Sequence, residues 1–222
     1  MTPRALLAIG LLLASTRATN LRAQIIQPRF SSDPIAWTSL SIGWLRQEGF
    51  RDKDSGDVWD FGSGPQWRAS LEMPIGRGGG SSWGVAGTLS RMPLIYSGGL
   101  LTGSCARCDA DANISQILGV LHLGGTSGFH QVIDISGGAT MFSNFRSTTG
   151  TKLGSGNTTT RYGFTIGYGF GYGFSPRASV MIVQDLSLLF LPRQSGNANN
   201  TAQQSATRLG FRYGLGSKGS RY

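Results

Sequence analysis

The sequence predicts an all-β protein whose fold is an eight-stranded antiparallel up-and-down transmembrane β-barrel. Three observations predict it. First, 34 of the 222 residues are glycine and only 14% are charged, whereas soluble domains contain about 7% glycine and about 25% charged residues. Second, several segments alternate with a period of two and present one apolar face, as strands do. Third, the connections between these segments alternate between long and short, as in outer-membrane barrels.

The first 23 residues have the order of a secretory signal peptide. A basic residue, Arg4, precedes an apolar core over residues 5–14, and small residues follow. Because this core is about half the roughly 20 residues that a membrane-spanning helix needs, we expect export and cleavage, not a membrane anchor. The expected cleavage follows Ala23, with Ala18 as the second choice. Residues 24–222 then form the barrel domain.

The clearest strand is predicted over residues 162–174. Aromatic residues and one isoleucine at even positions alternate with glycine and one threonine at odd positions. In a soluble protein, an almost all-glycine face would leave the strand nothing to pack against. In a small membrane barrel, the aromatic face meets lipid and glycine fits a crowded lumen. A soluble, secreted lipocalin-like ligand-binding barrel would instead have to fill its pocket with these aromatic side chains.

Seven other segments repeat this pattern, and in six of them the apolar face is predicted to point outward. The predicted strands cover residues 36–44, 61–73, 83–91, 114–123, 131–141, 180–190 and 207–215. The face assignment of 114–123 is ambiguous. An even strand number lets the barrel close, which matters because an unpaired sheet edge is unstable in lipid. The long connections (47–60, 97–113, 143–161 and 193–206) are predicted to be extracellular loops and the short ones (76–82, 124–128 and 175–177) periplasmic turns.

Aromatic residues gather near both ends of the predicted strands. Such residues form girdles at the two membrane interfaces of transmembrane barrels. The turn-side girdle is predicted to contain Trp37, Trp83, Phe129, Tyr172, Phe174 and Tyr213. The loop-side girdle is predicted to contain Trp59, Phe61, Tyr96, Phe142, Tyr162 and Phe190.

These features resemble the small eight-stranded outer-membrane barrels of Gram-negative-type bacteria, the OmpA-like and OmpX-like proteins. The resemblance covers nearly all of residues 36–215 and rests on the pattern of strands. It implies an outer-membrane location and a monomer surrounded by outer-membrane lipid of the lipopolysaccharide type. It also implies insertion by the barrel assembly machinery, which in that family reads an aromatic residue at the end of the last strand. In this sequence Tyr222 is a terminal aromatic residue, but it lies beyond the predicted strand 207–215.

Six charged residues fall on the predicted inward faces. They are Arg68, Glu72, Asp134, Asp185, Arg208 and Arg212. Side chains fill the lumen of an eight-stranded barrel, so these three bases and three acids are predicted to form a buried ion-pair network. A path for protons or ions through the lumen is the alternative. A wide porin channel is excluded, because aqueous pores belong to barrels of about 16 to 18 strands.

The sequence does not favour an enzyme. Some eight-stranded barrels modify lipid A, and such chemistry needs a histidine base beside a serine, oriented by a carboxylate. The only histidines are His122 and His130, and neither has a serine two positions away along a strand. Both are predicted to be polar residues beside the short turn 124–128. No cofactor is expected.

Two loop features carry candidate residues. Cys105 and Cys108 are the only cysteines, and they lie close together in an oxidising compartment, so a local disulfide is predicted. The first long connection contains four carboxylates, Asp52, Asp54, Asp57 and Asp60. A solvated acidic loop is the main interpretation and weak cation binding is the alternative, because the glycine precedes Asp57 where a calcium loop needs it after an acid or asparagine, and no closing glutamate follows.

The expected function is therefore that of a non-enzymatic outer-membrane barrel with a structural or surface-interaction role. Its loops would meet an extracellular partner that the sequence does not identify. Nucleic acid is not an expected partner, because the 20 lysines and arginines form no cluster. A narrow channel for ions or small apolar solutes and a soluble lipocalin-like barrel are the two alternatives.

Overall fold

The computed structural model describes residues 33–52, 56–76, 80–98, 105–153, 158–191 and 201–216. All of them belong to one compact unit, residues 32–222. The predicted signal peptide, residues 1–23, and Tyr222 lie outside the described residues. In the described part of the chain, no helix is long and apolar enough to cross a membrane.

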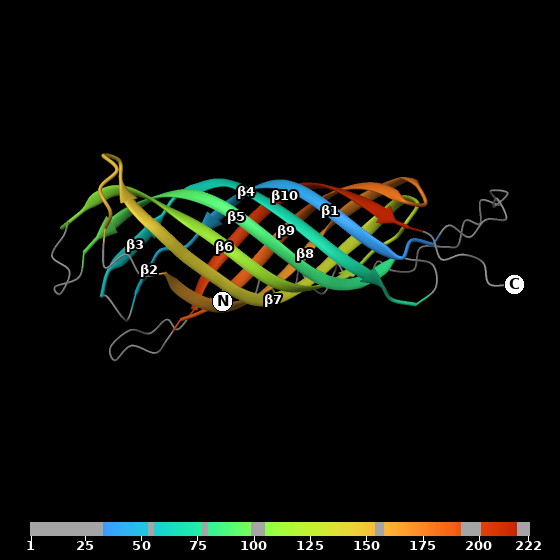
Figure 1. Ribbon diagram of the computed structural model, residues 1–222, viewed down its shortest axis with the longest axis horizontal. Coiled ribbons are helices and arrows are strands. Elements are labelled where there is room, and N and C mark those ends of the chain that lie inside the picture. Colours follow the sequence, from blue (N-terminus) through green and yellow to red (C-terminus); the bar gives the residue numbers. More distant parts are fainter. Residues whose placement is uncertain are drawn as a thin grey trace, which may run out of the picture. The chain divides into compact units, whose positions relative to one another are not determined.

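The predicted eight-stranded antiparallel barrel is confirmed (Figure 1). Its staves are β1 (Ala36–Gln47), β4 (Ser63–Pro74), β5 (Ser81–Ser97), β6 (Cys108–Leu123), β7 (Gly128–Ser147), β8 (Thr159–Ser175), β9 (Ala178–Phe190) and β10 (Thr201–Leu215). Each stave pairs with its neighbours in sequence, and the first pairs with the last, from Ala36 opposite Leu215 to Gln47 opposite Gln204. This pairing closes the barrel.

Two ends of the barrel are distinguished by their connections. At the turn end, residues 75–80, 124–127 and 176–177 join consecutive staves. The opposite end is the loop end. Several staves extend further toward the loop end than the sequence predicted: β5 runs to Ser97, β6 begins at Cys108 and β7 runs to Ser147. Parts of the predicted long connections are therefore strand, because the sheet continues beyond its apolar outer band.

The first long connection is also not the plain polar loop that the sequence predicted. It contains β2 (Phe50–Arg51) and β3 (Val58–Phe61), which form a small hairpin, and β3 pairs with the end of β5. The register with β5 shifts by one residue between β3 and β4, and the Gly62 amide donates to the Pro93 carbonyl (2.8 Å). Because such a shift exchanges the two faces of a strand, Phe61 points inward. Its predicted outward position is wrong.

The outer surface of the staves is apolar. Twenty-nine large apolar side chains are exposed in the described residues, among them Leu40, Trp44, Trp67, Leu71, Trp83, Leu89, Ile117, Phe129, Tyr162, Ile166, Tyr172, Ile182, Leu186 and Leu209. A monomeric soluble protein rarely exposes a continuous apolar surface of this kind. The alternation that the sequence shows therefore corresponds to an apolar exterior and a polar lumen over most of the barrel. On β6 the even positions from Ala110 to His122 point inward, which resolves the ambiguous face.

Glycine on the inner face of β8 allows close packing against β9. A Cβ at Gly169 would collide with the Ile182 carbonyl oxygen and the Val183 Cα, both backbone atoms. On the outer face, a Cβ at Gly87 would approach only the Gln116 carbonyl, at 3.9 Å. Glycine is therefore required at position 169, whereas alanine fits at position 87.

Gly169→Ala is expected to destabilise the barrel by about 1 to 3 kcal/mol, because the new methyl group overpacks a rigid backbone contact. Gly87→Ala is the matched control and should change stability by less than about 0.5 kcal/mol. Urea-induced unfolding in detergent micelles measures both. Equal unfolding midpoints for the two variants would contradict the close approach of β8 and β9.

Candidate functional site

The lumen is the candidate functional site, and its filling changes along the barrel axis. The six predicted charges occupy the half nearer the turn end, together with small apolar side chains such as Val132 and Val183; hydrogen-bonded neutral side chains follow, and an aromatic cluster fills the loop end. All six predicted lumen charges are buried there, each at most 5% exposed. The structure brings them together in two groups.

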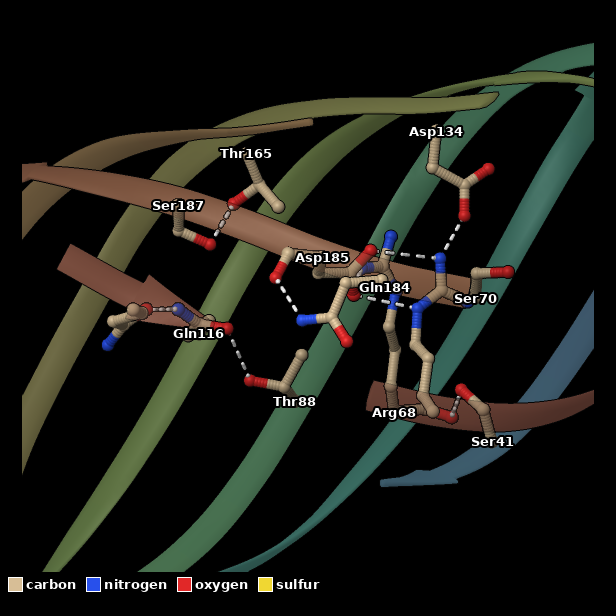
Figure 2. Close-up of polar contacts among 12 residues, drawn as sticks. Ser41, Arg68, Ser70, Thr88, Gln116, Asp134, Thr165, Gln184, Asp185 and Ser187 are labelled. Carbon is tan, nitrogen blue, oxygen red and sulfur yellow. Dashed lines mark hydrogen bonds and ion pairs between the residues drawn. The ribbon is translucent and has the colours of Figure 1, made fainter. Parts of the chain in front are cut away.

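The first group is centred on Arg208 of β10. Its guanidinium pairs with Asp185 of the adjacent β9 (Nε to Oδ2, 2.7 Å) and reaches across the lumen to Asp134 of β7. Arg68 of β4 also approaches Asp185, with Nη1 at 3.6 Å from Oδ2. Figure 2 shows Arg68, Asp134 and Asp185 converging from three different staves. The Arg208–Asp134 and Arg68–Asp185 contacts join strands that share no backbone hydrogen bond, whereas Arg208–Asp185 joins the paired strands β9 and β10.

The second group lies closer to the turn end. Arg212 donates from Nη2 to Glu72 Oε2 (3.1 Å) and to Ser82 Oγ (2.6 Å). Glu72 also accepts from the hydroxyls of Ser70 (2.6 Å) and Ser82 (2.5 Å). The Arg212 guanidinium lies over the Trp37 ring, 4.2 Å from its centroid. Trp37 is therefore an inward, cation–π partner of Arg212, and its predicted place in the turn-side girdle is wrong.

His122 belongs to this lumen network, although the sequence predicts only a polar residue beside a turn. It is 3% exposed, and its Nδ1–H donates to Asp134 Oδ1 (2.6 Å). The register places His122 directly opposite Asp134 across the β6–β7 hairpin. That pairing could have been found by counting outward from the turn 124–128, but the unassigned face of β6 concealed it. His130 does lie beside the turn, where its Nδ1 bonds the Gly128 carbonyl (2.9 Å).

The network balances its own charge. Three guanidinium groups face three carboxylates, and each carboxylate contacts at least one arginine. Asp134 and Asp185 each contact two partners, so removal of any one member leaves a buried charge without full compensation. Such an arrangement cross-links and fills the lumen. Buried charges that are paired in this way are stable, whereas breaking one pair is strongly destabilising.

A neutral polar layer separates the charges from the loop end. Gln116 of β6 is its centre, accepting from Thr88 (2.9 Å) and donating to Thr140 (3.1 Å) and to Gln204 on the far wall (3.0 Å). The Thr88–Gln116 contact is visible in Figure 2. Gln116 joins β6 to β10, which lie on opposite sides of the barrel. The layer therefore bridges the lumen with side chains that carry no charge.

An aromatic cluster fills the lumen at the loop end. Phe142 is fully buried, and its ring centroid lies 5.4 to 5.7 Å from those of Phe50, Trp59 and Phe61. Trp59 packs on Phe145 (4.4 Å), and Tyr96 is also buried. The predicted loop-side girdle is therefore wrong for Trp59, Phe61, Tyr96 and Phe142, which point inward. Only Tyr162 and Phe190 of that set face outward.

The acidic residues of the first connection have protein partners. Asp52 is buried and pairs with Arg161 of β8, and Asp57 is buried and accepts a hydrogen bond from the Tyr96 hydroxyl (2.5 Å). The interpretation as a solvated acidic loop is wrong for these two, because their carboxylates contact Arg161 and Tyr96 of the barrel wall. Asp60 is exposed, and Asp54 lies outside the described residues.

The two predicted disulfide cysteines also lie at the loop end of the barrel. Cys105 and Cys108 form a disulfide and pack against the aromatic cluster. Within the described ranges, no group of three or more histidine, cysteine or acidic side chains is arranged to hold a metal ion. The side chains of Asp52 and Asp57 are directed to protein groups, not to a shared point.

Comparison with solved structures places this architecture. Neisserial surface protein A superimposes with a TM-score of 0.53 at 11% identity, over 81% of this chain and 97% of that one. Ail, the attachment invasion locus protein of Yersinia pestis, matches with a TM-score of 0.40 at 12% identity, over 80% and 97%. OprG from Pseudomonas aeruginosa matches with a TM-score of 0.41 at 14% identity, over 82% and 97%. No family model and no curated protein matches the sequence.

The chain is thus a closed β-barrel of the small membrane type. More narrowly, it has the eight-stranded fold of the small outer-membrane barrels represented by Neisserial surface protein A.

Proposed function

We propose that the protein is an integral outer-membrane barrel without enzymatic activity, which acts through its loop end as a structural or surface-interaction protein. The observation that carries this proposal is the combination of an apolar exterior with a lumen filled by paired side chains. A lipid environment matches the exterior. The filled lumen favours the loop end, rather than the interior, as the place where partners bind.

The filled lumen also bears on the alternative of a narrow channel. A solute entering from the loop end would meet the aromatic cluster around Phe142, then the Gln116 layer and then the Arg208 group. Each layer joins staves on different walls of the barrel. Transport would require all three layers to separate, which supports a closed barrel.

The non-enzymatic assignment is supported by the position of His122. Its Nδ1 is bonded to Asp134, which resembles the orienting contact of a catalytic histidine. However, Ser82, the residue opposite His122 in the β5–β6 register, donates its hydroxyl hydrogen to Glu72 and is fully buried. This serine is therefore held as a structural donor within the ion-pair network, away from any substrate.

Membrane fractionation followed by electrophoresis of unheated and boiled protein tests the barrel assignment. The expected result is a band in the outer-membrane fraction whose mobility changes on boiling, because a closed barrel resists unfolding by detergent until heated. A soluble protein without a mobility change would contradict the proposal and favour the lipocalin-like alternative. N-terminal sequencing of the same band tests the predicted cleavage, which gives a chain beginning at Gln24.

Recordings in planar lipid bilayers test the closed lumen. Wild-type protein is expected to give no steady conductance, and Arg68→Ala or Glu72→Ala should also stay closed, because the Gln116 layer and the aromatic cluster still fill the lumen. Steady wild-type conductance of the folded barrel would contradict the closed lumen and favour the narrow channel. Gly87→Ala serves as the control, because Gly87 lies on the outer face.

A further inference from the structure

The outer face of β9 has one polar residue in the middle of its apolar surface. Its outward side chains are Val180, Ile182, Gln184, Leu186, Leu188 and Phe190, and the five apolar ones are all exposed. Gln184 is exposed as well, with two apolar positions on its turn side and three on its loop side. In a membrane its carboxamide therefore lies at the depth of the lipid chains, where water is absent.

Gln184 belongs to a row of outward side chains that can form hydrogen bonds. The register pairs it with Tyr168 of β8 on one side and with Thr207 of β10 on the other, and Thr207 pairs in turn with Trp44 of β1. The next row toward the turn end is entirely apolar and consists of Ile42, Leu209, Ile182 and Phe170. Polar groups thus meet across four neighbouring staves within the apolar surface.

A polar strip on β10 continues this row toward the loop end. Ser205 and Gln203 follow Thr207 on the outer face of β10. Beside them, β9 stays apolar, because Ser205 pairs with Leu186 and Gln203 pairs with Leu188. Polar and apolar side chains therefore lie next to each other at the same register positions. Lipid chains match the leucines but not their polar neighbours.

The hydrogen bonds within the row leave part of the Gln184 carboxamide unused. Thr207 donates its hydroxyl hydrogen to Gln184 Oε1 (2.5 Å). Gln184 Nε2 donates to the Asp185 carbonyl at 3.3 Å, slightly beyond the usual limit of about 3.2 Å. A carboxamide has two donor hydrogens and two acceptor lone pairs, so within the described residues one hydrogen and one lone pair of Gln184 have no partner. In lipid, no water replaces that partner, and the unpaired groups cost free energy.

A second copy of the chain has the chemistry that completes this carboxamide. An unused donor beside an unused acceptor is self-complementary, so two such groups that face each other across a twofold axis exchange two hydrogen bonds. A twofold interface brings the same surface of both copies together. If the axis runs along the membrane normal, both barrels keep the same orientation and the two Gln184 side chains lie at the same depth. The row carries no charge, so no like-charge repulsion opposes the contact.

We propose that the outer face of β9 and β10, centred on Gln184, is the interface of a symmetric homodimer within the membrane. The two Gln184 carboxamides form a reciprocal hydrogen-bonded pair, and Ile182 and Leu186 pack around it. Polar side chains associate membrane segments in this way, because the hydrophobic effect gives no preference between protein and lipid chains. The proposal rests on the membrane location proposed above. It differs from the monomer that the resemblance to small outer-membrane barrels implies.

Sedimentation equilibrium of the folded protein in density-matched nonionic micelles tests the interface. Wild-type protein is expected to dimerise reversibly, and Gln184→Met should weaken dimerisation about tenfold or more, because methionine keeps the shape but removes both hydrogen bonds. Gln131→Met is the matched control, since Gln131 is an exposed glutamine on the outer face of β7, near the turn end, and it should dimerise like the wild type. A wild type that stays monomeric, or equal dimerisation by Gln184→Met, would overturn the proposal.

Oxidative cross-linking in the native membrane identifies the partner. Leu186→Cys should give a product of twice the protein's mass, whereas Ile117→Cys, an exposed position on β6, should not. Cys105 and Cys108 are already joined in a disulfide and do not compete. A Leu186→Cys product of another mass, or no product, would overturn the assignment of a second copy. The mobility change on boiling keeps the two proposals apart: its absence in the wild type defeats the membrane barrel, whereas a monomer that retains it defeats only the dimer.

Discussion

Arg208→Met is expected to lower the free energy of unfolding by about 3 to 5 kcal/mol, the loss typical of breaking a buried ion pair by removing one partner. Methionine fills a similar volume but carries no charge. Asp134 and Asp185 then share only His122 and Arg68 as partners. In the wild type, Arg208 contacts both Asp134 and Asp185 and so joins β7 to β9. The variant loses this link between the two carboxylates.

Urea-induced unfolding of the protein in detergent micelles, followed by tryptophan fluorescence, measures this loss. Arg46→Met is the matched control, because Arg46 is an exposed arginine on the outer face of β1, and it should lie within about 0.5 kcal/mol of the wild type. If Arg208→Met and Arg46→Met unfold at the same urea concentration, the ion-pair network does not stabilise the barrel. The single variant Asp185→Asn and the double variant with Arg208→Met complete the cycle that gives the coupling energy between the two residues.

Phe142→Ala is expected to cost about 3 to 5 kcal/mol, because it removes a fully buried ring and leaves a cavity. The ring contacts Phe50, Trp59 and Phe61, so the first hairpin loses three ring contacts to β7 and keeps the one between Trp59 and Phe145. The variant should therefore also expose the hairpin to protease.

Two measurements separate these effects. Urea-induced unfolding measures the loss in free energy of unfolding of the whole barrel. Phe129→Ala is the control and should lose much less of this free energy, because its ring is 74% exposed on the outer face. The rate of trypsin cleavage after Arg51 of β2 measures how firmly the hairpin is held against the barrel. This rate should increase in Phe142→Ala and not in Phe129→Ala. An unchanged cleavage rate would mean that the hairpin is held without the aromatic cluster.

The barrel could be predicted from the sequence because one physical rule governs most of its residues. Lipid requires an apolar side chain at every second position, as in residues 162–174, and the lumen admits glycine and polar groups between them. The inward positions of Arg68, Asp134 and Arg212 follow directly from that alternation. These predictions depend only on local sequence.

The loop end could not be predicted in the same way. Beyond the apolar band, water outside and packing inside reverse the rule, so an aromatic residue such as Trp59 or Phe142 points into the lumen. The register shift at Gly62 moves Phe61 to the inner face, and no local pattern marks that shift. On β6, apolar residues occupy both faces, which hid the inward His122. Each error arises where contacts between distant strands, not membrane solvation, decide which way a side chain points.

The pairing of β1 with β10 has a consequence for biosynthesis. Ala36 pairs with Leu215, so the two edges that seal the cylinder come from opposite ends of the barrel sequence. Every other pair of neighbouring staves is also consecutive along the chain, whereas the seam joins the first stave to the last. Until the final stave is available, two strand edges remain open to any other chain, which is the usual route to aggregation. The seam is therefore the pairing that determines how long these two edges stay open.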